Sequence, residues 1–167
     1  MDARVNLHFA NKHILKVHFF RYVNIIVTQP RKLAAQALAR RVAEERGMYI
    51  VRHIDFEKGL NELIYLGWRL GGLIGYKVGL DKENASKDTR LMFVTTGLLI
   101  KMLIAKKSMA EWTHIIIDEV HERDKDIDFL LLLSRKFLTS NSPGCKIILM
   151  SATLNPEKLC SYYSWPL

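Results

Sequence analysis

Short apolar runs recur along the chain and predict the strands of a parallel sheet. They are rich in β-branched residues, as in Ile-Ile-Val and Ile-Ile-Ile, and such runs are typical of strands covered on both faces. We expect five strands, at residues 23–28, 74–78, 91–95, 114–118 and 146–150. Helices fill the intervals, so the pattern predicts an α/β fold with a mainly parallel sheet.

Two stretches between these runs have the spacing of helices. Residues 31–46 carry Ala34, Leu38 and Val42 at every fourth position, so we expect one packed face and one solvated face. A second helix is predicted over residues 96–107, where the closing lysines suit the negative end of the helix dipole.

Turn signals mark the remaining boundaries. Asn155 followed by Pro156 is a favoured helix start and predicts a final helix. The glycines at 71–72 and within 75–79 are interpreted as turn and bulge residues.

Composition and charge narrow the class of protein. The chain has 167 residues, of which 49% are hydrophobic and 25% charged, which predicts one globular domain and excludes disordered, collagenous and coiled-coil chains. No apolar run reaches the roughly 20 residues of a membrane span, and the N-terminus does not resemble a secretory signal. We therefore expect a cytoplasmic protein without a membrane partner. The two cysteines lack metal-ligand spacing and are interpreted as free thiols. A net charge of +8 suits a polyanionic partner without establishing one.

The strongest chemical signal is an acidic pair at the end of the fourth predicted strand. Asp118 and Glu119 fall at the carboxyl end of a buried strand, where open α/β sheets bind ligands. In nucleotide-hydrolysing sheets the first acid holds Mg²⁺, usually through water, and the second polarises the attacking water. Two other interpretations stay open. One is an acid pair that only caps the next helix, and the other is a zinc helix beginning at His121, although Lys125 occupies the position of its second ligand.

A second strand end carries groups suited to phosphate. In Thr28-Gln-Pro-Arg31-Lys32, backbone amides and two cations meet at the start of a helix. The sequence therefore predicts a phosphate-binding site. A basic helix start that is only solvated stays open as the simpler interpretation.

Two further strand ends carry hydroxyl groups. Thr95-Thr96-Gly97 joins a strand to a helix, and its small residue would let a phosphate backbone come close. Ser151-Ala-Thr153 follows the last predicted strand, with hydroxyls suited to bonding the acids or a neighbouring domain. Taken alone, the second of these also fits a simple turn.

The order of these short sequences is more informative than any one of them. Thr-Gln-Pro-Arg-Lys, Thr-Thr-Gly, Asp-Glu-Val-His and Ser-Ala-Thr follow one another at the predicted strand ends. In that order they resemble motifs Ia, Ib, II and III of the first RecA-like domain of DEAH-box RNA helicases, with Val for Ala in motif II. The resemblance covers roughly residues 22–167. It implies a RecA-like, P-loop NTPase-type three-layer fold.

The resemblance also implies roles for the residues at these positions. It assigns Mg²⁺ and water to Asp118 and Glu119, and the link between hydrolysis and domain motion to His121, Ser151 and Thr153. Contact with the RNA backbone falls to the following residues: Thr28, Arg31, Lys32, Thr95, Thr96 and Gly97. Thr96 departs from the family pattern, because the family usually has an acid at the middle position of this triplet. The implied activity is RNA unwinding with ATP and Mg²⁺, together with a second RecA-like domain.

Longer stretches of the sequence indicate one group within this helicase family. Gly-Tyr-Lys-Val-Gly-Leu, Thr-Thr-Gly-Leu-Leu and Asp-Phe-Leu-Leu-Leu are similar to the Tudor-domain-containing spindle-E group of germline helicases. That group implies piRNA-mediated silencing as the setting, and germline-granule proteins as partners.

Two features depart from the family pattern. A phosphate-binding loop needs Gly-x4-Gly-Lys-Ser/Thr, and the nearest spacing, Gly67 to Gly72, continues with Leu-Ile instead. We expect the chain to start just after this loop, with residues 11–21 as the remnant of its helix and the fold incomplete at the N-terminus. Residues 48–67 are interpreted as an insertion in a partial helicase domain that spans residues 1–167, either a gene-model artefact or a real surface insertion.

Two alternative functions stay open. One is a catalytically inactive RNA-binding or interaction module from a truncated or degenerate helicase gene, and the other is an ATPase that does not bind nucleic acid. Because a phosphate loop supplies most contacts with a triphosphate, we expect this chain alone to bind ATP weakly and not to unwind RNA.

Overall fold

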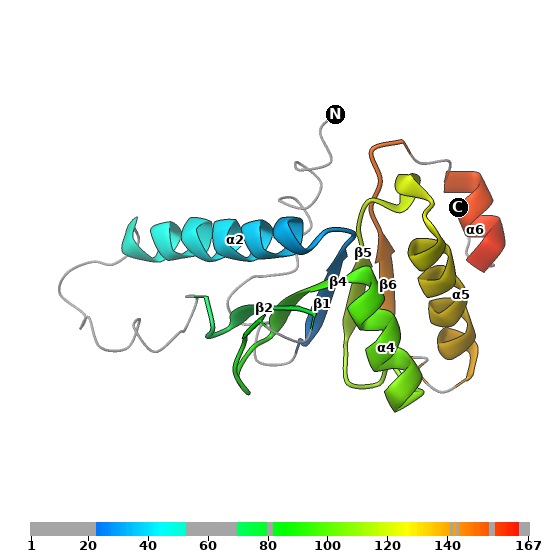
Figure 1. Cartoon of the computed structure of the whole chain (residues 1–167), viewed down its shortest axis with the longest axis horizontal. Helices are drawn as coiled ribbons and strands as arrows, with labels where there is room; N and C mark the ends of the chain where they lie inside the picture. Colours follow the sequence, from blue (N-terminus) through cyan, green and yellow to red (C-terminus); the bar gives the residue numbers. More distant parts are fainter. Residues whose placement is uncertain are drawn as a thin grey trace.

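One sheet with helices on both faces organises the part of the chain that the structure describes (Figure 1). The structure is a computed structural model, and it describes residues 23–52, 70–79, 82–140, 142, 144–153 and 156–163. In chain order the elements are β1 (Ile25–Gln29), α2 (Lys32–Arg52), β2 (Ile74–Val78), β3 (Lys82–Asn84), β4 (Leu91–Thr95), α4 (Thr96–Lys106), β5 (His114–Ile117), the 3₁₀ helix η2 (Val120–Glu122), α5 (Lys125–Ser140), β6 (Lys146–Leu149) and α6 (Pro156–Tyr163).

The sheet has the strand order β3-β2-β4-β1-β5-β6. Five neighbouring strands are parallel, and β3 pairs antiparallel with β2 at one edge. The five parallel strands are the five that the apolar runs predict, with ends that differ by at most two residues. The pattern missed β3 because its sequence, Lys-Glu-Asn, has no apolar residue.

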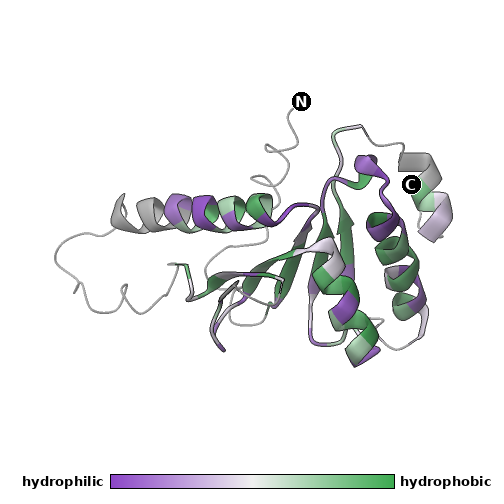
Figure 2. Cartoon of the chain, in the orientation of Figure 1, coloured by the Kyte–Doolittle hydropathy of each residue, from purple (hydrophilic) through white to green (hydrophobic). Residues whose placement is uncertain are grey.

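Alternation along the strands divides the core into two layers. Ile25 and Val27 of β1 pack with α2, whereas Ile26 between them packs with α4 and α5. On β5, Ile116 belongs to the first layer and its two neighbours belong to the second. Because successive side chains of a strand point to opposite faces, both faces of these central strands are covered. The predicted α/β three-layer architecture is therefore confirmed (Figures 1 and 2).

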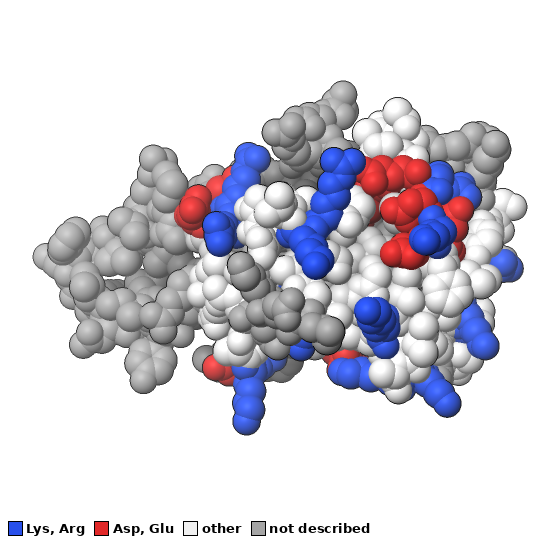
Figure 3. Space-filling view, viewed as in Figure 1, with Lys and Arg blue, Asp and Glu red and all other residues white. Residues whose placement is uncertain are grey.

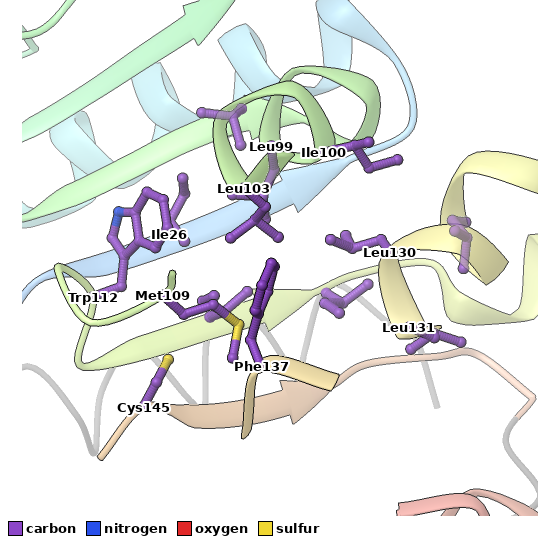
Figure 4. Packing of buried hydrophobic residues seen from close by; sticks show 14 of the residues in the cluster. Ile26, Leu99, Ile100, Leu103, Met109, Trp112, Leu130, Leu131, Phe137 and Cys145 are labelled. Atoms are coloured by element: carbon purple, nitrogen blue, oxygen red, sulfur yellow. The ribbon is translucent and has the colours of Figure 1, made fainter. Parts of the chain in front are cut away.

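The layer between the sheet, α4 and α5 contains the larger side chains. Figure 4 shows Leu99 and Leu103 of α4 and Phe137 of α5 pointing toward one another beside Ile26 of β1. Leu99, Leu103 and Ile26 have no exposed surface, and Phe137 is also buried. Close packing of this kind fixes α4 and α5 on the sheet and so fixes the loops at their N-termini.

The buried face of α2 differs from the predicted one. The fully buried positions are Ala35 and Ala39, whereas Ala34 and Leu38 are only half-buried. Val42 is buried as predicted. Small alanine side chains let the helix lie close to the sheet, so the packed face centres on them and not on the larger Leu38. Leu38 packs against the same core from its edge, so the predicted face is confirmed at Leu38 and Val42, while the spacing missed the two alanines at its centre.

Two predicted segments fall wholly or partly outside the described residues. The expected helix remnant at residues 11–21 lies outside them, as does most of the expected insertion at residues 48–67. The first residues of that insertion continue α2, which ends at Arg52 and not at residue 46.

The glycines around β2 have different roles. Gly79 has a φ of 68°, in keeping with its predicted turn. Gly75 lies within β2 itself, where a Cβ would come within 2.7 Å of the backbone oxygen of Asn84. Its role is therefore to allow close approach of the end of β3, and the bulge that was predicted for this stretch is not found at Gly75.

The C-terminal helix packs through a buried polar contact. As predicted, α6 begins at Pro156, while Asn155 lies outside the described residues. The Tyr163 hydroxyl lies 2.7 Å from the Ser134 hydroxyl of α5 and donates to the backbone oxygen of Leu131 at 3.1 Å. Among the described helices, none combines the length and the apolar composition required to cross a bilayer.

Candidate functional site

Four strand ends meet at the carboxyl edge of the sheet. The register pairs Thr28 of β1 with Ile117 of β5, and Ile117 with Leu149 of β6. On the other side of β1, Gln29 pairs with Thr95 of β4. The predicted short sequences follow these strands directly, so the fold brings all four to one edge. Figure 1 shows the loops after β5 and β6 at this edge, near the start of α2.

Asp118 is held by a hydrogen bond to each of its carboxylate oxygens. Its side chain is buried, with 5% of its surface exposed. The Gln29 amide donates from Nε2 to Oδ2 at 2.6 Å, and the backbone N–H of Glu119 donates to Oδ1 at 2.8 Å. Burial raises the pKa of Asp118 above its usual value, while these two hydrogen bonds and nearby His121 oppose the rise. The carboxylate therefore has a fixed orientation.

Glu119 occupies a sharp turn between β5 and η2. Its φ of 56° is a left-handed conformation that side chains rarely adopt. The turn directs its half-buried carboxylate to His121, with 3.4 Å between Oε2 and Nδ1. Burial and the neighbouring Asp118 charge raise the pKa of Glu119. Residues held in strained conformations cluster at functional sites, which makes this turn a candidate of the same kind.

His121 connects the acid pair to the loop after β6. The backbone N–H of Ala152 lies 3.4 Å from Nδ1, the same ring nitrogen that faces Glu119. The backbone also joins the two loops, because the Val120 N–H donates to the Met150 oxygen at 3.0 Å. The structure therefore brings the Ser-Ala-Thr sequence to the Asp-Glu-Val-His sequence through main-chain groups.

The two hydroxyls of the Ser-Ala-Thr sequence lie in different surroundings. The Ser151 oxygen is buried and has no hydrogen-bond partner among the described residues. Thr153 is exposed. The two hydroxyls predicted to take part in coupling thus flank Ala152 in the chain, and the observed contact with the His121 ring comes from the Ala152 backbone.

The segment that joins β1 to α2 carries its cations at the surface. Arg31 is exposed, and its guanidinium lies 3.7 Å from the Glu122 carboxylate of η2. Lys32 is also exposed, and its ammonium lies 3.4 Å from the position that a Cβ at Gly79 would occupy. Thr28 has no exposed surface, and its hydroxyl lacks a partner in the described part of the chain. The cations therefore face solvent, while the Thr28 hydroxyl does not.

The start of α4 has no acid of its own. Thr95 is the N-cap but makes no side-chain cap hydrogen bond, and the first turn holds no acidic residue. Thr96 is buried, with its hydroxyl unpaired within the described ranges. Beside Gly97, the Asp126 carboxylate of α5 lies 3.2 Å from where a Cβ would stand. A carboxylate from another helix thus lies close to the positive end of the α4 dipole.

Two residues of this edge were missed by the sequence reasoning. Gln29 was part of a quoted sequence without a role, and the contact with Asp118 follows only from the pairing of β1 with β5. Asp126 was also unassigned, because its position near Gly97 depends on how α5 packs beside α4. No spacing in the sequence indicates either contact.

The acidic side chains near Asp118 extend over the start of α5. Figure 3 shows this group of Asp and Glu side chains, with Lys and Arg side chains close to it. Arg123 forms an ion pair with Asp128 at 2.7 Å, and the Asp124 carboxylate accepts the Ile127 N–H at 2.7 Å as the helix cap. These acids therefore serve α5, which leaves the Asp118 and Glu119 pair as the acids of the strand end.

The donor chemistry at the edge suits magnesium better than zinc. Mg²⁺ is usually bound through one or two carboxylates together with water and phosphate oxygens, and Asp118 with Glu119 supply such a pair. The described residues contain no group of three or more His, Cys, Asp or Glu side chains placed to share a metal ion. The buried and unpaired Ser151 oxygen is a further oxygen group close to this edge. The residues present therefore fit Mg²⁺ accompanied by a phosphate ligand.

Comparisons with known proteins agree with this geometry. The DEAD/DEAH box helicase family matches residues 55–161. The "Probable ATP-dependent RNA helicase spindle-E" of Aedes aegypti is 47% identical over 149 residues, which are 89% of this chain and 9% of that protein. The "ATP-dependent RNA helicase TDRD9" of Rattus norvegicus is 45% identical over 145 residues, which are 87% of this chain and 9% of that protein. The chain thus spans about a tenth of the length of these relatives.

The family match covers more than half of the chain and includes the β4, β5 and β6 strand ends. It confirms the resemblance to DEAH-box helicases that the four short sequences indicate, and the similarity to spindle-E confirms the narrower resemblance. The chain therefore belongs to the DEAD/DEAH box helicase family, and its sheet with helices on both faces is the RecA-like fold of that family's domain.

Proposed function

We propose that this chain supplies the catalytic acids and part of the RNA-binding surface of an ATP-dependent RNA helicase. The observation that carries the proposal is that the buried Asp118 and the half-buried Glu119 lie at the same sheet edge as the basic segment that follows β1. Acids and cations placed side by side suit the two ligands of such an enzyme, a nucleotide with its metal ion and an RNA backbone.

The acids are proposed to act on ATP in different ways. Asp118, with its fixed orientation, is the proposed Mg²⁺ residue, through an intervening water. Mg²⁺ would supply neutralisation of the charge that develops on the phosphate oxygens. Glu119 is half-buried with a raised pKa, and it is the proposed residue that orients and polarises the attacking water.

His121 is proposed to transmit the state of this site to the loop after β6. Its Nδ1 contacts both the Glu119 carboxylate and the backbone N–H of Ala152. A displacement of either group therefore changes the surroundings of this one nitrogen. Ser151 and Thr153 flank Ala152 and are proposed to act in the same coupling, toward a second RecA-like domain of the longer protein. Closure of such a pair of domains on ATP is the proposed origin of movement along RNA.

The RNA backbone is proposed to lie over the ends of β1 and β4. Arg31 and Lys32 present their charges to solvent there, and Thr95 and Gly97 are partly exposed beside them. The hydroxyls of Thr28 and Thr96 are buried, so these residues are proposed to support this surface from beneath and not to face the RNA directly.

Binding of single-stranded RNA by the chain tests this surface. We expect the double variant Arg31→Ala and Lys32→Ala to weaken binding, and to lower the slope of log affinity against log salt by about 1.4, since single strands give roughly 0.7 per phosphate contact. Lys136→Ala with Lys146→Ala is the matched control, because it removes two exposed charges from the opposite end of α5 and β6. Fluorescence anisotropy across a salt series measures both. Equal affinity and slope in the two double variants would contradict the proposed surface, and absence of RNA binding by the unaltered chain would favour an ATPase that does not bind nucleic acid.

The setting of the longer protein belongs to the same proposal. From the resemblance to the spindle-E group of germline helicases, we propose a cytoplasmic setting in piRNA-mediated silencing, with germline-granule proteins as partners. A second candidate is an inactive RNA-binding module. Both candidates predict RNA binding, and only the first predicts ATP turnover when a phosphate loop and a second domain are joined to this chain.

A further inference from the structure

Gln29 is the buried residue in closest contact with the proposed Mg²⁺ carboxylate. It is the last residue of β1, and 3% of its surface is exposed. Its Nε2 donates to Asp118 Oδ2 at 2.6 Å, across 89 positions of sequence. The pairing of Thr28 with Ile117 places the next residue on each strand side by side, so the contact is a consequence of the β1 and β5 register.

The contact accounts for one of the two oxygens of Asp118. The other oxygen accepts the backbone N–H of Glu119, which any residue type at position 119 other than proline would supply. The Gln29 bond depends on its side chain alone. Removal of the Gln29 amide would therefore free one side of the carboxylate to rotate, while the backbone bond remained.

The same residue lies between the two functional segments of the edge. Two residues further along, Arg31 reaches Glu122, which follows the acid pair on η2. The segment from Thr28 to Lys32 is thus tied to the segment from Asp118 to Glu122 twice, by one buried hydrogen bond and by one exposed ion pair. The buried bond is shielded from solvent and salt, whereas the exposed pair is not.

We propose that Gln29 is a positioning residue that orients the Asp118 carboxylate for a divalent cation and connects the cation site to the RNA-facing end of β1. This inference rests on the proposed function of Asp118. Groups that orient a metal ligand typically contribute 10-fold to 100-fold to metal affinity, and Gln29 has the contact, the burial and the donor chemistry for that role.

Binding of Mn²⁺ to the chain tests the inference without any need for turnover. Mn²⁺ is used as a paramagnetic substitute for Mg²⁺, and broadening of the NMR signals around Asp118 gives its occupancy. We expect Gln29→Leu, which keeps a similar shape and removes the donor, to weaken Mn²⁺ binding about 10-fold or more. Gln29→Asn keeps an amide on a shorter side chain and should recover part of the loss. It also carries the test if the leucine variant does not fold.

A matched control comes from the second glutamine of the chain. Gln36 lies on α2, partly exposed, and Gln36→Leu should leave Mn²⁺ binding unchanged. The contact also has its own spectroscopic signature. The side-chain amide protons of Gln29 should exchange slowly with water, and this protection should be lost in Asp118→Ala and retained in Gln36→Leu.

The outcomes separate the two proposals. Loss of Mn²⁺ binding in Asp118→Asn together with unchanged binding in Gln29→Leu would overturn the role of Gln29 and leave the role of Asp118 intact. Absence of Mn²⁺ broadening in the unaltered chain, or broadening unchanged in Asp118→Asn, would refute the cation site itself and the role of Gln29 with it.

Discussion

Replacement of Asp118 by two different residues should give two different stabilities. In Asp118→Asn, the remaining oxygen keeps the bond from the Glu119 N–H, and the new amide nitrogen faces Gln29. Gln29 can rotate its amide so that its oxygen accepts from that nitrogen, so both contacts survive. In Asp118→Ala both contacts are lost, and the Gln29 amide, with 3% of its surface exposed, is left buried without a partner.

The magnitude follows from these contacts. A buried polar group left unpaired costs about 1–3 kcal/mol. In the asparagine variant, a neutral hydrogen bond replaces a charge-assisted one, which costs about 1 kcal/mol. This loss is offset because the variant no longer buries a charged carboxylate. We therefore expect the free energy of unfolding of Asp118→Asn to lie within about 1 kcal/mol of the unaltered chain, and that of Asp118→Ala to lie about 2 kcal/mol lower than that of Asp118→Asn.

Urea unfolding followed by circular dichroism measures the difference. The two variants should have the same slope with urea concentration and different midpoints, because the surface exposed on unfolding is nearly the same. Equal destabilisation of the two variants would show that Gln29 does not pair with the residue at position 118, which would refute the reasoning.

Three further predictions address the fold and its titrating groups. Gly75→Ala should destabilise the chain by about 1–3 kcal/mol in urea unfolding, because its Cβ would lie 2.7 Å from the backbone oxygen of Asn84 in β3. Gly144→Ala, with no atom within 4 Å of the added Cβ, should change the unfolding free energy little. Burial raises the pKa of Cys145 to about 11 from 9.0. In a Cys160→Ser variant, the Cys145 thiol should therefore react with a disulfide reagent at pH 8 about 100-fold more slowly than an ordinary thiol. Reaction at the rate of an ordinary thiol would contradict the burial of Cys145. Burial raises the pKa of Tyr163 to about 12 from 10.0, so its contribution to the unfolding free energy is complete below pH 10 and is lost as the pH rises through 12. Tyr163→Phe should remove about 2 kcal/mol of the decline in unfolding free energy between about pH 10 and about pH 12. An identical decline in both proteins would refute this.

The parallel strands were predictable because burial on both faces leaves uninterrupted apolar runs. Ile115, Ile116 and Ile117 form such a run and are all buried. The strand β3 was not predictable in this way, since its pairing with β2 uses backbone groups and its residues are Lys, Glu and Asn. The packed face of α2 was predicted at Leu38 and Val42, but its fully buried centre was missed because Ala35 and Ala39 contribute close approach and not apolar bulk.

The candidate site was predictable at the level of strand ends and not at the level of contacts. The position of Asp118 at the end of a buried strand follows from the sequence around it. Its bond with Gln29 depends on the register of two strands that are 89 positions apart, and the approach of Asp126 to Gly97 depends on the packing of two helices. Spacing along a chain carries no information on either relation, so these contacts required the structure.

The central claim is that this edge of the sheet forms part of an RNA-stimulated ATPase. The most direct test replaces the matching segment of the Aedes aegypti spindle-E relative with residues 22–167 of this chain, and measures ATP hydrolysis with and without single-stranded RNA. The account predicts RNA-stimulated turnover that falls about 100-fold or more in Glu119→Gln, the loss expected when a general base is removed. Turnover that does not respond to RNA, or that is unchanged in Glu119→Gln, would contradict it.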